Sequence, residues 1–274
     1  MSSHGDGRRR VTIHDLAARR ARGERFVMVT AYDANAASIL DGLDVPVLLV
    51  GDSLGMVMLG HETTLPVTLD DMIHHAAAVV RARPRALVVV DLPFGSYQRG
   101  PDQALESAVR VIKESGADAV KLEGGARAVP SVRLLVEAGI PVMGHLGLTP
   151  QSVAQFGGFR VQGRDEAAAA AIVDDAVALA EAGAFATVLE CVPASLASRV
   201  RAASPVPVIG IGAGTDVDAQ VLVWHDLLGL SAAPHPRFVR AYADLRTVIA
   251  DAVSAFGDDV RSGAFPSDAE SYGD

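Results

Sequence analysis

The strongest constraint on the fold is a repeated alternation of short, β-branched apolar runs with longer segments of helical periodicity. The apolar runs predict about eight strands, at 26–31, 46–50, 86–91, 118–123, 140–144, 185–190, 206–211 and 220–224. The intervening segments predict helices at 34–43, 68–82, 101–116, 129–138, 166–183 and 194–203. This alternation is typical of repeated βα units around a parallel sheet.

Several of the strand segments are apolar at nearly every position, such as VPVLLV at 45–50 and ALVVV at 86–90. A strand that is apolar on both faces is buried from both sides, as in a closed barrel surrounded by helices. We therefore expect an α/β protein with the (β/α)8 TIM-barrel fold rather than an open doubly wound sheet. Barrels of this kind routinely use roughly 200–250 residues as one domain.

No linker or shift in composition divides residues 26–230, which we expect to form the barrel as a single domain. Residues 1–25 are expected to form a polar leader and an added helix that begins after Thr12. Residues 231–274 are expected to form a helical extension over 236–263 and a tail. The leader is rich in arginine, but no apolar core of a secretory signal follows it.

Composition excludes several classes of partner. Half of the residues are hydrophobic, yet no run approaches the ~18 residues of a membrane-spanning helix, so we expect no membrane partner. The formal net charge of −9 argues against a nucleic-acid partner, because such proteins normally carry a concentrated basic surface. The single cysteine, Cys191, leaves no internal disulfide and fits a cytoplasmic protein. Small molecules are the expected ligands.

Ionisable residues stand at the ends of five of the predicted strands. In a barrel the active site lies where the strands end and the βα loops begin, so these side chains should converge on one mouth. They are Asp52, Asp91, Lys121 with Glu123, His145 and Glu190.

Three carboxylates at one mouth would repel one another and resist ionisation unless a cation were present. Asp52, Asp91 and Glu123 are hard oxygen ligands suited to Mg²⁺, and they predict a divalent metal site. The alternative is that each acid caps the helix that follows it, as a single Asp after a strand commonly does.

Only Lys113 and Lys121 are lysines among the 24 Lys and Arg residues. A lysine at the end of a core strand in such a chain suggests a compact ammonium that stabilises a developing oxyanion. A salt bridge to Glu123 is the simpler alternative. Because side chains alternate along a strand, Cys191 should face away from Glu190 and behave as a small buried hydrophobe rather than a nucleophile.

A set of short motifs occurs in order over about residues 11–266. They are TAYD at 30–33, VGDSLGM at 50–56, GH at 60–61, TLPVT at 64–68, DLPF at 91–94, VKLEGG at 120–125, GHLGLTPQ at 144–151, LECVP at 189–193 and GIGAG at 210–214. Each motif alone is weak, but the ordered set closely resembles the ketopantoate hydroxymethyltransferase (3-methyl-2-oxobutanoate hydroxymethyltransferase) family.

The resemblance implies a cytoplasmic (β/α)8 enzyme of pantothenate biosynthesis with one Mg²⁺ per subunit. Such an enzyme transfers a hydroxymethyl group from 5,10-methylenetetrahydrofolate to 3-methyl-2-oxobutanoate and forms 2-dehydropantoate. It also implies a homo-oligomer, often a decamer. Carried over motif by motif, the metal ligands would be Asp52, Asp91 and Glu123, the oxo-acid contacts Asp52, Ser53, Asp91 and Lys121, and the proton acceptor Glu190.

The chain departs from the family pattern at two places. Ala219 stands where the family commonly has glycine, between Asp218 and Gln220, and residues 269–272 read AESY where Glu-His-Ser-Tyr or Glu-His-Ser-Phe is frequent. The first change adds a methyl group to a loop and touches none of the expected ligands. The second puts in doubt any role of that segment in subunit contacts or in closure over folate.

Three other functions remain open at this point. The glycine-rich segment 210–214 follows the seventh predicted strand, where barrels often bind phosphate. The carboxylates also fit Mg²⁺-dependent 2-oxo acid lyases and mutases of the isocitrate lyase and phosphoenolpyruvate mutase type, although the nucleophilic cysteine loop of the lyases is not seen. A barrel that binds but no longer catalyses would be indicated by the loss of a metal acid, and none is lost.

Overall fold

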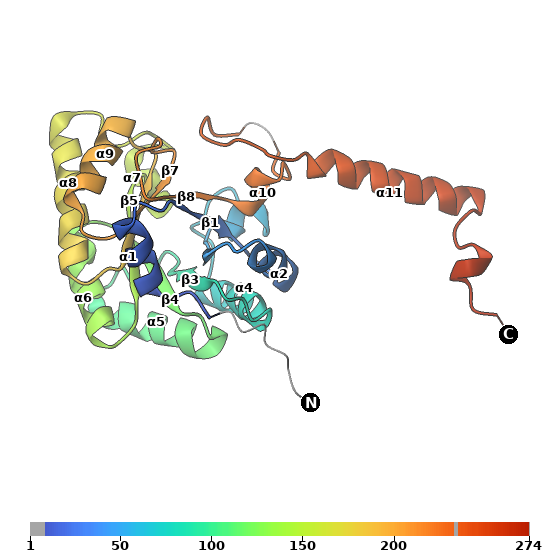
Figure 1. Ribbon diagram of the computed structural model, residues 1–274, viewed down its shortest axis with the longest axis horizontal. Helices are drawn as coiled ribbons and strands as arrows, with labels where there is room; N and C mark the ends of the chain where they lie inside the picture. Colours follow the sequence, from blue (N-terminus) through green and yellow to red (C-terminus); the bar gives the residue numbers. More distant parts are fainter. Residues whose placement is uncertain (1–8, 233–234, 274) are drawn as a thin grey trace. The chain divides into compact units, whose positions relative to one another are not determined.

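The computed structural model describes residues 9–232 and 235–273, and the chain forms two compact units that divide after Val223. In the first unit eight parallel strands follow one another around a closed barrel, with the last strand paired to the first. The expected α/β fold of the (β/α)8 type is confirmed. The strands, labelled in Figure 1, are β1 Phe26–Thr30, β2 Val47–Val50, β3 Leu87–Asp91, β4 Ala119–Glu123, β5 Val142–Gly147, β6 Ala186–Glu190, β7 Val208–Ile211 and β8 Ala219–Leu222.

Two predicted strand bounds are wrong. β5 ends at Gly147 and not at residue 144, because both of its neighbours continue to pair with it: Glu123 pairs with His145 and Glu190 with Gly147. His145 therefore lies inside a strand instead of after one. β8 begins at Ala219, which is buried in the barrel core and not in a loop as expected. The strand ends at Leu222, and the short helix α10 occupies the end of the predicted 220–224 strand.

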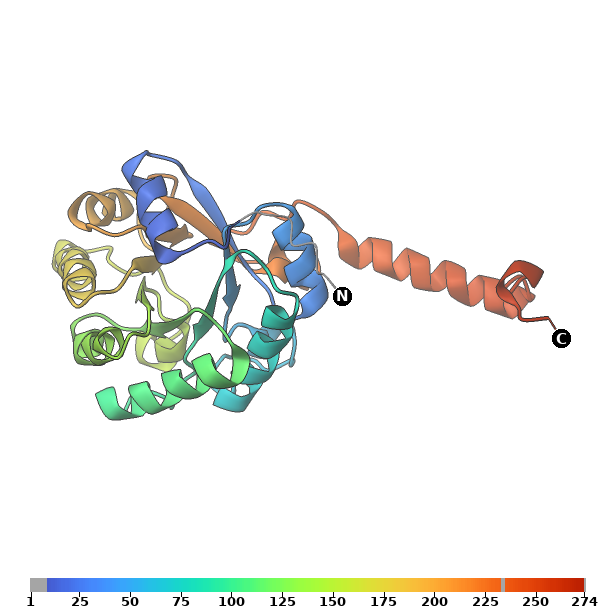
Figure 2. The same ribbon diagram turned by 60° about the horizontal axis from the view of Figure 1, so that its bottom comes forward.

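The helices of the first unit lie outside the barrel (Figure 2). The long ones coincide closely with the predictions and are α2 Ala34–Gly42, α4 Leu69–Arg81, α5 Pro101–Ser115, α6 Val129–Glu137, α8 Glu166–Glu181 and α9 Ala194–Ala203. Side chains that cap the first turn help to determine where a helix begins. The side chain of Asp33, for example, accepts a hydrogen bond from Ala36 N at 2.8 Å and caps α2. Four short elements in the βα loops were not predicted: α3 Leu54–Val57, the 3₁₀ turns Ala126–Ala128 and Pro150–Ser152, and α7 Val153–Phe156.

The inside of the barrel is an apolar core built from every second strand residue, as in Val47 and Leu49 of β2. The residues between them pack beneath the helices, and every position of β2, β3 and β4 is buried. Burial on both faces explains the continuous apolar runs in the sequence. Leu16 of the N-terminal helix α1 (Ile13–Ala21) is fully buried and belongs to the same core, beside Phe26 at the start of β1. This helix closes the barrel end at which the strands begin.

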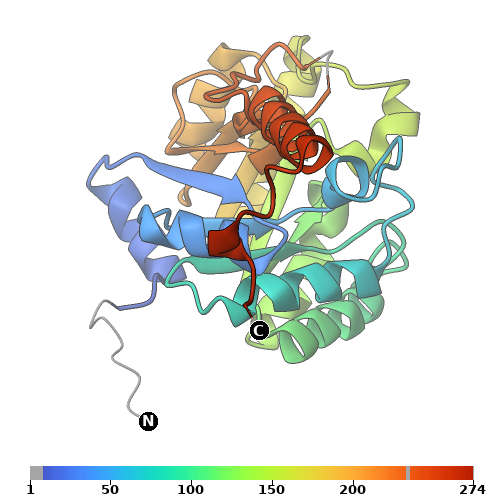
Figure 3. The same cartoon turned by 90° about the vertical axis from the view of Figure 1, so that its right-hand side faces the viewer.

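The second unit contains α10 (Trp224–Leu227), α11 (Leu245–Ser262) and the 3₁₀ turn Asp268–Glu270. The predicted helix over 236–263 is wrong at its start, because the helix begins only at Leu245. The amide groups of Tyr242 and Leu245 donate instead to the carbonyl oxygens of Leu227 and Leu228. Figure 1 shows α11 from the side and Figure 3 shows it nearly end-on. Among the residues described, no helix combines the length and apolar character needed to cross a membrane.

Candidate active site

The predicted site residues continue the inward-facing alternation of the barrel strands. On β3 the inward series runs from Leu87 and Val89 to Asp91, because these residues are two apart. The equivalent series lead to Lys121 and Glu123 on β4, to His145 on β5 and to Glu190 on β6. Polar groups thus form the last layer of side chains inside the barrel, at the end where βα loops begin.

The structure brings Asp52 and Ser53 to this layer through the loop after β2. The backbone N–H of Asp52 donates to Asp91 Oδ2 at 3.1 Å, which places the two acids side by side. The Ser53 hydroxyl lies 2.9 Å from the hydroxyl of Tyr32, a residue that is buried beneath the mouth. The aspartates are each 5% exposed or less, so they are shielded from bulk water.

A chain of polar contacts crosses the mouth from Asp91 to Glu190. Lys121 Nζ lies 2.8 Å from Asp91 Oδ1 and 3.4 Å from His145 Nδ1. The same imidazole nitrogen is 3.3 Å from Glu123 Oε1, and His145 Nε2 is 3.2 Å from Glu190 Oε2. Glu190 is the most open member of this chain, with its side chain 16% exposed.

Burial and crowding of like charges shift the pKa values of these groups. Burial, with the nearby charges of Asp91 and Glu123, raises the pKa of Asp52 to about 8. Burial also raises the pKa of Asp91, although the ammonium of Lys121 opposes the rise. Burial alone would lower the pKa of Lys121, but the carboxylates around it outweigh burial and raise it.

His145 is held in its charged form by its two carboxylate neighbours. Burial and the charge of Lys121 would lower the pKa of His145, but the adjacent carboxylates of Glu123 and Glu190 raise it to about 9. With all groups ionised, four carboxylates then face the ammonium of Lys121 and an imidazolium, which leaves a formal charge of −2. A single divalent cation would balance that charge.

Gln151, from the 3₁₀ turn after β5, is the main site residue that the chemical reasoning missed. Its side-chain Nε2 donates to Asp52 Oδ2 at 2.8 Å, and its backbone N–H donates to Glu123 Oε2 at 3.1 Å. Tyr97, from the loop after β3, donates to Gln151 Oε1 at 2.6 Å. A neutral side chain does not stand out among the ionisable residues at strand ends. Gln151 is, however, the last residue of the GHLGLTPQ motif, and that position could have identified it.

Two alternatives for the charged residues are wrong. The acids do not cap the following helices, because the N-cap residues there are Ser53, Gly100 and Gly125. The ion pair of Lys121 is made with Asp91 rather than with Glu123.

Cys191 follows the last residue of β6 and has a φ of 48°, a backbone conformation that few non-glycine residues adopt. Burial, with the charge of Glu190, raises the pKa of its thiol to about 12. The thiol is therefore protonated near neutral pH, which agrees with the expectation of a non-nucleophilic cysteine. In the glycine-rich segment, a Cβ at Gly214 would lie 2.6 Å from the Cβ of Ala194, so close packing against α9 accounts for this glycine.

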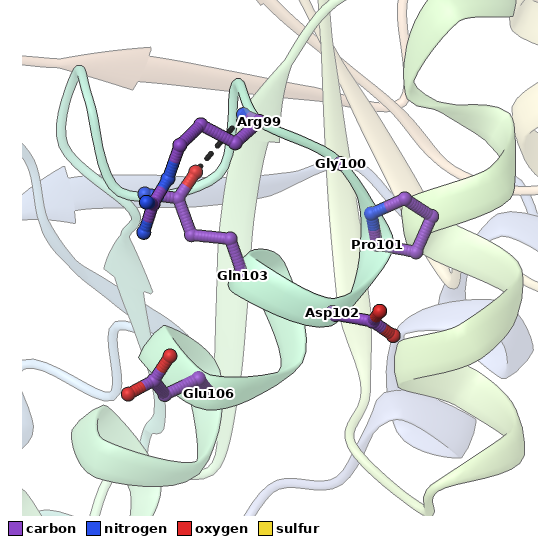
Figure 4. Close-up of a pocket in the computed structure, with 6 residues that line it drawn as sticks. All are labelled: Arg99, Gly100, Pro101, Asp102, Gln103 and Glu106. Carbon is purple, nitrogen blue, oxygen red and sulfur yellow. Dashed lines mark hydrogen bonds between the residues drawn. The ribbon is translucent and has the colours of Figure 1, made fainter.

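Two cavities lie near the loops after β3 and β4. One of about 350 Å³ is formed by the start of α5 and is lined by Arg99, Gly100, Pro101, Asp102, Gln103 and Glu106 (Figure 4). It contains none of the predicted site residues, and the Arg99 N–H donates to Gln103 Oε1 within it at 2.9 Å. A second cavity of about 250 Å³ includes Tyr97 and Glu123 in its lining and therefore borders the mouth.

Comparison with solved structures shows the same fold in enzymes of low sequence identity. A crystal structure of phosphonopyruvate hydrolase in complex with oxalate and Mg²⁺ matches with a TM-score of 0.60 and 12% sequence identity, over 95% of this chain and 93% of that one. A crystal structure of 2,3-dimethylmalate lyase, a member of the PEP mutase/isocitrate lyase superfamily, matches with a TM-score of 0.57 and 16% identity, over 95% of this chain and 91% of that one.

Sequence comparison is far more specific. The profile of the ketopantoate hydroxymethyltransferase family matches residues 10–268. The 3-methyl-2-oxobutanoate hydroxymethyltransferase of Moorella thermoacetica is 60% identical over 97% of this chain and 98% of its own length. The enzyme of that name from Thermobifida fusca is 58% identical over 99% of this chain and its own full length. The chain therefore belongs to the ketopantoate hydroxymethyltransferase family, enzymes that transfer a hydroxymethyl group to 3-methyl-2-oxobutanoate.

Proposed function

We propose that the mouth of the barrel removes the C3 proton of 3-methyl-2-oxobutanoate and joins C3 to the one-carbon unit of 5,10-methylenetetrahydrofolate. The observation that carries this proposal is the order of groups across the mouth. Two adjacent aspartates and Lys121 lie on one side, Glu190 lies on the other, and His145 stands between them. This order separates a cation-binding region, which would hold the oxo acid through Mg²⁺, from a base, as enolisation requires.

The residues at the mouth fit one Mg²⁺ per subunit. Asp52 and Asp91 supply adjacent hard oxygen donors, and Mg²⁺ is usually held by one or two carboxylates together with water and substrate. In residues 9–232 and 235–273 no group of three or more His, Cys, Asp or Glu side chains has the geometry of a metal site. Glu123 lies 3.3 Å from His145 Nδ1 through Oε1 and accepts the backbone N–H of Gln151 with Oε2, whereas Asp52 and Asp91 contact each other directly. We therefore assign direct ligation to Asp52 and Asp91, and a contact through water to Glu123.

When bound, Mg²⁺ supplies a Lewis acid that polarises the keto group of the oxo acid and acidifies its C3 proton. Ser53 and Lys121 orient the oxo acid, and the ammonium of Lys121, held by Asp91 at 2.8 Å, stabilises the negative charge that develops on oxygen. Glu190 accepts the C3 proton, and its partial exposure leaves it accessible to substrate. His145 Nε2, 3.2 Å from Glu190 Oε2, keeps that carboxylate aimed into the mouth.

The electron pair released at C3 then forms the new carbon–carbon bond to the methylene carbon of the folate, whose nitrogen takes up the electrons of the broken carbon–nitrogen bond. Water then attacks the same carbon as its second carbon–nitrogen bond breaks, and leaves its hydroxyl group there. The proton taken from C3 and a proton from this water go to the two folate nitrogens, so the products are 2-dehydropantoate and tetrahydrofolate. Phosphonopyruvate hydrolase, which has the same fold, has been solved in complex with oxalate and Mg²⁺, and this supports a small carboxylate and Mg²⁺ as ligands of a barrel of this kind. Identities near 58% favour the transferase over the lyase and mutase alternatives.

We also propose a homo-oligomer, with ten subunits as in the family pattern, in the cytoplasm. α11 supports assembly, because apolar side chains recur along it at helical spacing: Ile249, Val253, Phe256 and Val260. The single cysteine supports a reducing compartment. Sedimentation at working concentration tests the assembly, and a clean monomer would contradict it.

Turnover tests the function directly. Incubation of the protein with 3-methyl-2-oxobutanoate, the folate donor and a series of divalent metals should yield 2-dehydropantoate, as followed by NMR. Activity should be lost with a chelator and restored by Mg²⁺. A protein that forms product equally well in excess chelator would contradict the metal assignment, and one that forms none with any metal would contradict the function.

A further inference from the structure

Gln151 occupies an unusual place, because its side chain and backbone together contact two of the three acids assigned to the metal region. We propose that Gln151 is a positioning residue that holds Asp52 and Glu123 in the arrangement that accepts the cation. The proposal rests on the function proposed above and extends it to a neutral side chain. Gln151 is 6% exposed and comes from the 3₁₀ turn Pro150–Ser152.

Every hydrogen-bonding group of the Gln151 side chain is used. Nε2 donates one hydrogen to Asp52 Oδ2 at 2.8 Å and the other to the carbonyl oxygen of Leu92 at 3.0 Å. Oε1 accepts from the hydroxyl of Tyr97 at 2.6 Å and from Gln98 Nε2 at 3.1 Å. An amide has two donors and one acceptor oxygen with two lone pairs, so this arrangement is saturated.

The contacts also determine which way the amide points. The Tyr97 hydroxyl accepts the backbone N–H of Glu123 at 3.1 Å, so its own hydrogen is directed to Gln151 Oε1. The oxygen of the amide is thereby fixed on the Tyr97 side. Its nitrogen must then face Asp52, to whose Oδ2 it donates at 2.8 Å.

A neutral donor suits this position better than a cation. Lys121 already pairs with Asp91, and a second positive charge against Asp52 would cancel the negative charge that attracts a divalent ion. The amide of Gln151 orients Asp52 without adding charge. Its backbone N–H holds Glu123 at the same time, so one residue links the ends of β2 and β4.

The test compares Gln151→Leu with the wild-type protein and with Gln103→Leu. Gln103 is a matched control, because its side chain bonds only to the backbone of Gly95 and Arg99 among the contacts described. Titration calorimetry with MgCl₂ alone measures the metal affinity, and steady-state kinetics measure kcat and the KM for each substrate. Thermal unfolding of the metal-free proteins measures any general loss of stability.

We expect Gln151→Leu to weaken Mg²⁺ binding by roughly tenfold or more, because a hydrogen bond to a charged group is lost. kcat at saturating Mg²⁺ should fall, while the KM for the folate donor should not change. Gln103→Leu should match the wild type in Mg²⁺ affinity, kcat and KM. Tyr97→Phe retains Gln151 but removes the hydroxyl that orients it, and should weaken Mg²⁺ binding by a smaller factor.

Wild-type Mg²⁺ affinity in Gln151→Leu, with or without a lower unfolding temperature, would overturn the proposal and leave a structural role. If Gln151→Leu does not fold, Tyr97→Phe decides, and unchanged Mg²⁺ affinity in that variant overturns the proposal. A wild-type protein that turns over substrate without binding Mg²⁺ overturns this inference and the metal assignment together. A wild-type protein that binds Mg²⁺ but gives no product overturns the proposed reaction alone, because the affinities of the variants still test Gln151.

Discussion

At the scale of single residues, the site depends on backbone segments that approach each other too closely for any residue larger than glycine. Gly147 is the sharpest case, because its φ is 87° and a Cβ there would lie 2.2 Å from the carbonyl oxygen of Glu190. The Leu148 N–H donates to this same oxygen at 2.9 Å. Gly147 thus lets the ends of β5 and β6 meet beside the proposed base.

We predict that Gly147→Ala destabilises the protein by ~2 kcal/mol or more and lowers kcat, because the clash displaces the backbone of Glu190. Chemical denaturation and steady-state kinetics measure the two effects. Gly139→Ala is a control at a similar φ of 85°, with no atom within 4 Å of its Cβ, and should lower stability less with no effect on kcat. Equal kcat in Gly147→Ala and wild type would contradict this account of the turn.

At the scale of elements, the guanidinium of Arg20 fixes α1 to the end of the barrel at which the strands begin. Arg20 lies 2.5 Å from Asp218 Oδ2 and donates to the carbonyl oxygens of Val206, Arg201 and Ser204. Asp218 also accepts the Val208 N–H at 3.0 Å, so this aspartate joins the loop before β8 to the start of β7. The arginine is 20% exposed, which weakens the pair only moderately.

We predict that Arg20→Met lowers the free energy of unfolding by about 1–3 kcal/mol, because it leaves three carbonyl oxygens without this donor and removes one of the two guanidinium partners of Asp218, which keeps Arg201 at 2.8 Å. Arg22→Met removes an exposed pair with Glu24 and should have no measurable effect. Urea unfolding of both variants provides the comparison. Folded Arg20→Met should retain its activity, because the change lies at the barrel end opposite the mouth. Similar stability of Arg20→Met and Arg22→Met would contradict the proposed role of Arg20.

The strands were largely predictable, because burial on both faces leaves continuous apolar runs such as 86–90. The charged members of the mouth were predictable from their places at strand ends. Gln151 and Tyr97 were not, because they come from loops, and only long-range contacts bring them to Asp52 and Glu123. The start of α11 was missed because the N–H groups of Tyr242 and Leu245 donate to the carbonyl oxygens of Leu227 and Leu228, at the end of α10.

At the scale of the whole molecule, folding concentrates negative charge at one end of an otherwise apolar barrel, and protons compete with a cation for it. The pKa of Asp52 is raised to about 8 without metal. Because Mg²⁺ binds the ionised carboxylate, binding below that pH must release a proton. We predict that the affinity for Mg²⁺ increases by up to about tenfold per pH unit between pH 6 and pH 8 and levels off above. Calorimetry in buffers of different ionisation heat measures both quantities, and an affinity that is independent of pH would contradict the prediction.

The central claim is that this mouth enolises the oxo acid, with Glu190 as the base. The most direct measurement is the exchange of the C3 proton of 3-methyl-2-oxobutanoate for deuterium, followed by NMR with Mg²⁺ and without folate. The wild-type protein should exchange this proton, and Glu190→Gln should stop the exchange while it still binds Mg²⁺ and the oxo acid. Undiminished exchange in Glu190→Gln, or its absence in a wild-type protein that binds both ligands, would contradict the account.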